Sequence, residues 1–281
     1  MSIIVDGNRI AKGIFTRLRQ AIAAHHLRPH LAVVLVGSDP ASQTYVRKKQ
    51  EAAGLIGIEF SLFKYDENIS TQKLVNEIRR IQTNPSLSGI IVQLPLPKTI
   101  DKRLVLNTLK PELDVDYLSW ESLGKLVIGE NSLVPPTPGA ILEVLHSHKV
   151  PLIGKHVVLV GSGDLIGKPL TNLLIQMPLT LTVCNKETKN LAALTKQADI
   201  LITGAGIAGL IKARMLKRGV VVVDAGVSFR KKKIFGDVKF EEVRLVASLI
   251  TPTPGGVGPI TVAKLLENTI INAKAKNQRS K

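Results

Sequence analysis

Two side chains four residues apart, Tyr45 and Lys49, could carry proton-transfer chemistry. On a helix this spacing places a phenol and an ammonium on one face. The helix would follow an apolar run at 31–37, so both groups would lie near the carboxyl end of a strand, where α/β sheets bind ligands. The neighbouring cations Arg47 and Lys48 would lower the pKa of Lys49 and make it a usable acid or base near neutral pH. A surface lysine beside Lys48 is the alternative.

Further polar side chains stand next to apolar segments. Gln93 follows the apolar run GIIV, where its amide could orient a neighbouring group. A hydrogen bond at the strand end is the alternative. In the segment DVD, Asp114 and Asp116 would point to one side if the chain is extended there. A solvated turn is the alternative for this pair.

A second candidate site is the glycine turn VGSGDLIGKP at residues 160–169. A strand-like run precedes it, a helical pattern follows, and Gly161, Gly163 and Gly167 are spaced G-x-G-x-x-x-G. The standard dinucleotide fingerprint is G-x-G-x-x-G. Small residues let the backbone approach a pyrophosphate, and free N–H groups at a helix N-terminus attract its charge. We therefore predict a dinucleotide-binding turn, with a plain tight turn as the alternative.

The elements that position these groups alternate between strand-like and helical patterns. Continuously apolar strands separated by helices indicate parallel sheets covered on both faces, so we predict an α/β fold. Helical patterns include 70–82 and 259–273. The predicted strands are 31–37, 58–65, 89–97, 156–161, 179–184, 198–204 and 219–226.

Two segments share the tetrapeptide PTPG, at 134–140 and 250–259. We interpret them as the two crossings between domains. Residues 1–139 and 256–281 would form a catalytic domain with a parallel sheet. Residues 140–255 would form an inserted Rossmann-type dinucleotide-binding domain, with a ligand cleft between the two.

Composition excludes several classes of protein. A chain of 281 residues can build two cores, and the single cysteine, Cys184, excludes an internal disulfide and a cysteine-rich metal site. The histidines show no convincing metal spacing, so we predict no metal. No apolar run reaches the ~18 residues that cross a bilayer, and no signal peptide is recognisable. We expect a cytoplasmic protein without a membrane partner.

The formal net charge of +16 suits nucleic acid or small anionic substrates. Basic residues cluster at 230–233 and in the tail that ends at Lys281. Neither cluster has interleaved aromatic residues for base stacking, so we read a solvated loop and a frayed end, and expect no nucleic-acid partner. A basic nucleic-acid-binding protein without enzyme activity is the alternative from a different class.

Together these stretches resemble one family over nearly the whole chain, the bifunctional methylenetetrahydrofolate dehydrogenase/cyclohydrolases. The resemblance implies oxidation of 5,10-methylenetetrahydrofolate with NADP, or with NAD, and hydrolysis of the methenyl product to 10-formyltetrahydrofolate. It implies one-carbon metabolism that serves purine, methionine and histidine biosynthesis, folate substrates with one or more glutamates, and a homodimer formed through the second domain. Its motifs here are VDGNRIA, VGSDPASQTYVRKK, GIIVQLPLP, PELDVD, PPTPGA, GSGDLIGKP, FGDV and ITPTPGGVGPIT.

The resemblance also assigns a role to each candidate catalytic residue. Lys49 matches the lysine that handles protons in the cyclohydrolase step, and Gln93 the glutamine that orients this lysine. Tyr45 matches the tyrosine that packs against the folate. Asp116 matches the aspartate that holds the N–H donor edge of the pterin.

The remaining predicted contacts come from the family's binding loops. Pro254, Gly255 and Gly256 fall in the loop that approaches the substrate. The predicted dinucleotide contacts are Gly161, Ser162, Gly163, Ile166, Gly167, Lys186 and Val227.

The sequence departs from the family at several positions, some of which bear on the dinucleotide and on the folate. Ser162-Gly163 replaces a usual Arg-Ser, whose arginine would hold the 2′-phosphate of NADP as a bidentate partner. Lys186 could supply a charge there, without the fork geometry. Tyr117 replaces a usual glycine, and its ring would crowd the folate site or stack in it. A cyclohydrolase whose dehydrogenase activity is lost or shifted to NAD is therefore the alternative within the family.

Overall fold

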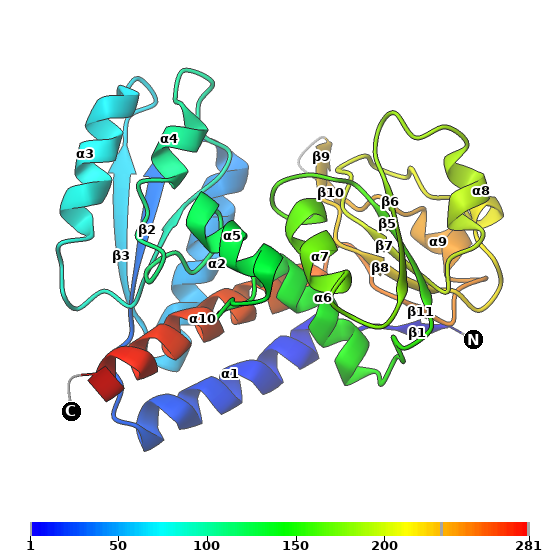
Figure 1. The fold of residues 1–281 in the computed structure, drawn as a ribbon, viewed down its shortest axis with the longest axis horizontal. Coiled ribbons are helices and arrows are strands. Elements are labelled where there is room, and N and C mark those ends of the chain that lie inside the picture. Colours follow the sequence, from blue (N-terminus) through cyan, green and yellow to red (C-terminus); the bar gives the residue numbers. More distant parts are fainter. Residues whose placement is uncertain (1, 231–232, 280–281) are drawn as a thin grey trace. The chain divides into compact units, whose positions relative to one another are not determined.

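The computed structural model describes residues 2–230 and 233–279, which form two compact units. The first, which we call the three-stranded unit, comprises Lys12–Pro136 and Val262–Lys281. The second, the six-stranded unit, comprises Met1–Ala11 and Thr137–Thr261. Figure 1 shows the helices and strands of both.

The three-stranded unit has a parallel sheet in the order β3-β2-β4. The central strand β2 pairs with a strand on each side and is buried along its whole length. Helices α3 and α4 pack against one face of the sheet through apolar side chains such as Leu74, Ile78 and Leu106. The strands are β2 (His30–Val36), β3 (Glu59–Tyr65) and β4 (Gly89–Val92), and the helices are α2 (Pro40–Ile56), α3 (Thr71–Ile81), α4 (Lys102–Leu106) and α5 (Trp120–Ile128).

Local sequence signals fix the ends of helix α2, which carries two of the candidate catalytic residues. The Asp39 carboxylate accepts a hydrogen bond from the backbone N–H of Ser42 at 2.7 Å, and Pro40 occupies the first turn. Both features are typical of helix N-termini. Gly57 ends the helix with a left-handed backbone at φ 85°, which glycine adopts without a steric penalty.

The six-stranded unit has a parallel sheet in the order β1-β11-β8-β7-β5-β6. The chain turns from β5 to β6 on one side and to β7 and β8 on the other, so the carboxyl ends of β5 and β7 form a topological switch point. The strands are β1 (Ile3–Ile4), β5 (His156–Val160), β6 (Thr180–Cys184), β7 (Ile200–Thr203), β8 (Val221–Asp224) and β11 (Leu249–Ile250), with an antiparallel hairpin of β9 (Ser228–Arg230) and β10 (Lys233–Phe235). The helices are α6 (Pro136–Ser147), α7 (Gly167–Leu174), α8 (Leu191–Thr195), the 3-10 helix η1 (Ala213–Met215) and α9 (Phe240–Val243).

The predicted α/β class with parallel sheets and two domains is confirmed. Two elements differ in length from the prediction. The strand predicted at 89–97 ends at Val92, because Pro95 and Pro97 have no N–H to donate to a sheet. The last helix, α10, runs over Val257–Arg279, longer than the predicted 259–273.

The unit boundaries fall at 11/12, 136/137 and 261/262. The first eleven residues, predicted in the catalytic domain, belong to the six-stranded unit. The cause is β1, which pairs with β11: Ile3 N–H donates to the carbonyl of Ser248 at 2.8 Å and Val5 N–H to that of Ile250 at 2.9 Å. Helices α1 (Gly7–Ala24) and α10 therefore each contribute residues to both units.

Within the part of the chain that the structure describes, every helix is too short or too polar to cross a membrane. Lys231, Lys232 and Lys281, from the two predicted basic clusters, lie outside that part.

Candidate functional site

Lys49 and Gln93 meet in the three-stranded unit, as predicted for a lysine and its orienting amide. Lys49 Nζ donates a hydrogen bond to Gln93 Oε1 at 3.0 Å. Gln93 Nε2 donates to the carbonyl of Leu94 at 2.7 Å, and its backbone N–H donates to the carbonyl of Val34 at 2.8 Å. The amide is therefore held with its oxygen toward the ammonium group, at the carboxyl ends of β2 and β4.

The pKa values of Lys49 and Asp116 move in opposite directions for the same reason. Burial lowers the pKa of Lys49, and the negative charge of Asp116 opposes that shift. Burial raises the pKa of Asp116, and the positive charge of Lys49 opposes it. Both side chains keep a partial exposure, so they are desolvated yet accessible to a small ligand. Both shifts increase the fraction of the neutral form relative to that of an ordinary surface side chain.

The predicted cause of the Lys49 shift is wrong. Arg47 and Lys48 are exposed on α2, and Arg47 lies 3.8 Å from Glu51 in an ion pair. Desolvation lowers the pKa of Lys49 instead. Tyr45 shares the half-buried face with Lys49, and burial raises the pKa of its phenol, which therefore stays protonated at neutral pH.

The two carboxylates of the DVD segment have different surroundings. Asp114 is fully buried, and its carboxylate accepts hydrogen bonds from the backbone N–H groups of Leu118 at 3.2 Å and Ser119 at 2.8 Å. It caps a turn, whereas Asp116 interacts with the charge of Lys49. The segment is thus neither a solvated turn nor a matched carboxylate pair.

Asn268 is a residue of this region that the sequence reasoning missed. From helix α10 its side-chain amide donates to the carbonyl of Val115 at 2.9 Å and to that of Val134 at 2.8 Å. It is 3% exposed. These bonds fix the backbone immediately before Asp116. The only sequence signal is a polar residue inside the apolar pattern of the last helix.

Tyr117 is 2% exposed and has a left-handed backbone with φ 61°, a conformation that glycine adopts more readily. Its hydroxyl hydrogen-bonds with Ser132. The ring therefore belongs to the packing of the three-stranded unit.

In the six-stranded unit the glycine turn has the close packing that a dinucleotide cradle needs. Gly161 has φ 115°, and a Cβ there would lie 2.6 Å from the carbonyl oxygen of Gly204. A Cβ at Gly167 would collide with the carbonyl of Gly161, whereas Gly163 faces open space. No side chain caps helix α7 at Ile166. The turn thus fits a pyrophosphate, with tight glycines on either side of an open one.

The other predicted dinucleotide residues lie at the same edge of this sheet. Ser162, Lys186 and Val227 are exposed just beyond the carboxyl ends of β5, β6 and β8. Lys186 Nζ lies 3.6 Å from Glu187 Oε1, and both side chains are at least 80% exposed. Lys186 is therefore available to an anion at the end of β6.

The predicted substrate loop, Pro254 to Gly256, also belongs to the six-stranded unit. Gly255 has φ 101°, and its carbonyl accepts a hydrogen bond from Gly7 N–H at 2.9 Å. A Cβ at Gly7 would collide with the carbonyl of Gly256. This contact explains why a glycine stands in the N-terminal VDGN motif. The predicted catalytic residues and this loop belong to different units.

A buried carboxylate, Asp224, ends strand β8 and was not predicted. It accepts backbone hydrogen bonds from Gly226 at 2.9 Å, Asp237 at 3.2 Å and Val238 at 3.0 Å. Burial raises the pKa of Asp224 to about 7, and the charge of Asp237 adds to the rise, against the three N–H donors. The sequence signal is an acid that directly follows the apolar run VVV.

We predict that Asp224 makes stability fall as the pH rises. Because its folded pKa lies above its ordinary value of 3.8, its stabilising contribution is complete below about pH 4 and is lost as the pH rises through about 7. The loss is on the order of 4 kcal/mol. Between pH 5 and pH 8, the Tm of thermal unfolding should decrease less for Asp224→Asn than for the parent. Equal decreases in both proteins would contradict the prediction.

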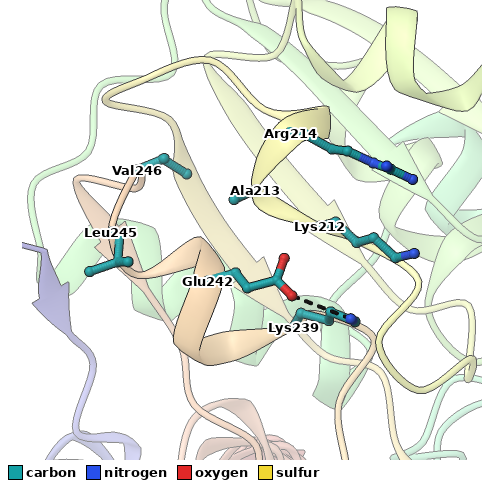
Figure 2. Close-up of a pocket in the computed structure, with 7 residues that line it drawn as sticks. All are labelled: Lys212, Ala213, Arg214, Lys239, Glu242, Leu245 and Val246. Carbon is teal, nitrogen blue, oxygen red and sulfur yellow. Dashed lines mark ion pairs between the residues drawn. The ribbon is translucent and has the colours of Figure 1, made fainter.

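A pocket of about 560 Å³ lies between η1 and α9 (Figure 2). Figure 2 shows Lys212 and Arg214 extending in the same direction from η1, while Lys239 lies 3.3 Å from Glu242 in an ion pair. None of the predicted catalytic or binding residues lines it. In the described residues, no three or more His, Cys, Asp or Glu side chains are grouped to hold a metal ion.

Comparison with known families and proteins gives a consistent result. The family model described as "Tetrahydrofolate dehydrogenase/cyclohydrolase, catalytic domain" matches residues 5–116. The model described as "Tetrahydrofolate dehydrogenase/cyclohydrolase, NAD(P)-binding domain" matches residues 135–277. A curated relative, the "Bifunctional protein FolD" of Exiguobacterium sibiricum, is 44% identical over 277 residues, which are 98% of this chain and 100% of the relative.

Solved structures agree over the same length. The bifunctional FolD dehydrogenase/cyclohydrolase of Campylobacter jejuni matches with a TM-score of 0.94 and 38% identity, over 98% of this chain and 99% of that one. The dehydrogenase-cyclohydrolase of Trypanosoma brucei, solved with NADP cofactor and an inhibitor, matches with a TM-score of 0.94 and 36% identity over 98% of each chain.

Proposed function

Since the chain belongs to the tetrahydrofolate dehydrogenase/cyclohydrolase family, we propose that it catalyses both reactions of that name with NADP as the oxidant. It would oxidise 5,10-methylenetetrahydrofolate to the 5,10-methenyl compound and hydrolyse that product to 10-formyltetrahydrofolate. The observation that carries the proposal is the hydrogen bond between Lys49 and Gln93, because it places a lysine of lowered pKa against a fixed amide.

In the oxidation, the chain's own groups bind and orient the reactants. NADP bound to the six-stranded unit would supply the hydride acceptor for the oxidation. The glycine turn and helix α7 would hold its pyrophosphate through backbone N–H groups. Asp116 would accept hydrogen bonds from the N–H donors of the pterin, and Tyr45 would pack against the folate. Orientation of this kind supplies a large part of the rate enhancement when two ring systems must react.

In the hydrolysis, Lys49 would move the protons. Its lowered pKa increases the fraction of neutral amine, which can accept a proton from the water that attacks the methenyl carbon. The resulting ammonium can return a proton to the ring nitrogen when the carbon–nitrogen bond breaks. Gln93 Oε1 accepts an N–H of Lys49 and so directs the reactive face of the amine.

The first test is initial velocity with 5,10-methylenetetrahydrofolate and NADP or NAD in parallel assays, beside hydrolysis of the methenyl compound. We expect reduction of NADP and hydrolysis. Reduction of NAD alone would assign the other dinucleotide. If neither NADP nor NAD is reduced and the methenyl compound is still hydrolysed, the protein is a cyclohydrolase only.

Lys186 is the residue that we propose to distinguish the two dinucleotides. It is exposed beyond β6, and it supplies a point charge where the usual arginine is absent. We expect Lys186→Ala to raise the KM for NADP by about tenfold, the effect of one charge-assisted contact, and to leave the KM for NAD nearly unchanged. The control is Lys196→Ala, which removes another exposed lysine of the same unit. Equal changes in both KM values would contradict the role.

We also propose the finer properties that accompany this function. A homodimer through the six-stranded unit is supported by its edge strand β6, whose Val183 is 41% exposed, and sedimentation would measure it. Polyglutamylated folates would suit the charge of +16. A single buried cysteine suits the reducing cytoplasm, where one-carbon units serve purine, methionine and histidine biosynthesis.

A further inference from the structure

We propose that Asp237 is a positioning residue for dinucleotide binding, which acts by holding the loop after strand β7. This loop, residues 204–207, is called the β7 loop below. The inference rests on the proposed function, since it assumes that the six-stranded unit binds a dinucleotide. Asp237 follows Gly236 in the FGDV motif and is fully buried.

The carboxylate of Asp237 receives three hydrogen bonds, all from strand β7 and its loop. Its Oδ2 accepts from the hydroxyl of Thr203 at 2.5 Å and from the backbone N–H of Ala205 at 2.6 Å. Its Oδ1 accepts from the N–H of Ile207 at 2.7 Å. Both oxygens are therefore used, and together they determine the path of the loop over three residues.

The β7 loop packs directly against the glycine turn. The carbonyl of Gly204 is the group that a Cβ at Gly161 would approach within 2.6 Å, and a Cβ at Gly204 would lie 3.1 Å from the side chain of Ile166. Beyond this contact, Gly206 and Ile207 are exposed. The loop thus continues the surface of the turn at the switch point between β5 and β7, where α/β sheets bind ligands.

Asp237 is itself held by the buried Asp224. The Asp224 carboxylate accepts the N–H groups of Asp237 and Val238, which stand on either side of the Cα of Asp237. Glycines make room for both carboxylates, because a Cβ at Gly226 would collide with Asp237 and a Cβ at Gly236 with Asp224. The two acids therefore connect the end of β8 to the β7 loop through hydrogen bonds.

An asparagine at position 237 has the size of aspartate but cannot accept all three bonds. Its single carbonyl oxygen can serve either Thr203 and Ala205 or Ile207. Its NH₂ group would then face a donor at the other position. The β7 loop would have to move away from that donor, while the three-stranded unit, which holds Lys49, is unaffected.

A matched control is available at the opposite end of the same sheet. Asp199 accepts the backbone N–H of His156, the first residue of β5, at 2.9 Å; it directly precedes β7 and lies 2.6 Å from Lys217 in an ion pair. Asp199→Asn therefore weakens the same unit by the same chemical change, far from the carboxyl ends of the strands.

The experiment titrates the full chain with NADP and with NAD in the absence of folate, and measures methenyl hydrolysis in the same preparations. For Asp237→Asn we expect at least a tenfold rise in Kd for the preferred dinucleotide, with hydrolysis within twofold of the parent. For Asp199→Asn we expect both the Kd for the dinucleotide and the rate of hydrolysis to stay within twofold of the parent. If both variants lose affinity equally, or if Asp237→Asn binds like the parent, the positioning role is wrong.

A second variant provides the test if Asp237→Asn does not fold. Thr203→Val keeps the side-chain volume and removes one donor to Asp237, so a smaller rise in Kd, about threefold, is expected. If Asp237→Asn does not fold and Thr203→Val leaves the Kd unchanged, the positioning role of Asp237 is wrong. A parent that binds neither dinucleotide would instead refute the proposed dehydrogenase function, and the inference with it.

Discussion

Replacement of Lys49 by methionine is expected to reduce methenyltetrahydrofolate hydrolysis by about 10²- to 10⁴-fold, the usual contribution of a positioned acid or base. Methionine fills a similar volume but cannot carry a proton. The fold should persist, because the substitution removes a desolvated ammonium, whose pKa burial lowers. Kinetics of hydrolysis and thermal unfolding of the same variant measure the two effects separately.

The control for this variant is Lys48→Met. Lys48 is the adjacent residue on α2, but it is exposed and lies on a different face from Lys49. We expect near-parental hydrolysis from it. Hydrolysis at the parental rate in Lys49→Met would refute the role of Lys49. Equal losses in both variants would show that the basic charge of α2, rather than one placed amine, is what matters.

Gly167→Ala is expected to abolish dinucleotide binding and to destabilise the six-stranded unit by about 1 to 3 kcal/mol, the usual effect of forcing a methyl group into a closely packed site. The added methyl would collide with the carbonyl of Gly161 and lie 2.5 Å from the Cα of Ser162. Both are backbone atoms of the turn, so they cannot turn aside as a flexible side chain can. Dinucleotide titration and thermal unfolding measure the two losses.

Gly163→Ala is the matched control for stability, since it adds the same methyl group to the same turn where no atom lies within 4 Å. We expect it to unfold like the parent. Hydrolysis by Gly167→Ala should survive at temperatures where the fold is intact, because Lys49 and Gln93 belong to the other unit. Full dinucleotide affinity in Gly167→Ala would show that the turn does not hold the pyrophosphate.

The sequence predicts features that depend on neighbouring residues along the chain. Apolar runs predicted the buried strands, as in β2, and the four-residue spacing placed Tyr45 and Lys49 on one face of α2. The polar residue after GIIV became the partner of Lys49 because two parallel strands end at the same edge of the sheet.

Features that depend on distant parts of the chain were not predictable in this way. Asn268 bonds to a carbonyl 153 residues away, and Asp237 to an N–H 32 residues away. Each looks like an ordinary polar residue in its own segment. The same limitation explains the wrong cause assigned to the pKa of Lys49, since desolvation depends on the whole surrounding structure, whereas Arg47 and Lys48 are visible in the sequence.

The pairing of β1 with β11 also has a consequence for synthesis on the ribosome. Ile3 is synthesised before its partner Leu249, which follows 246 positions later. At about 5 to 20 residues per second, the first strand waits about 10 to 50 s for its place in the sheet. Strands β2, β3 and β4 all lie within residues 30–92, so their sheet can form while the rest of the chain is still being translated. During the delay Ile3 and Ile4 have no strand to pair with, so the six-stranded sheet is completed only after β11 has been synthesised.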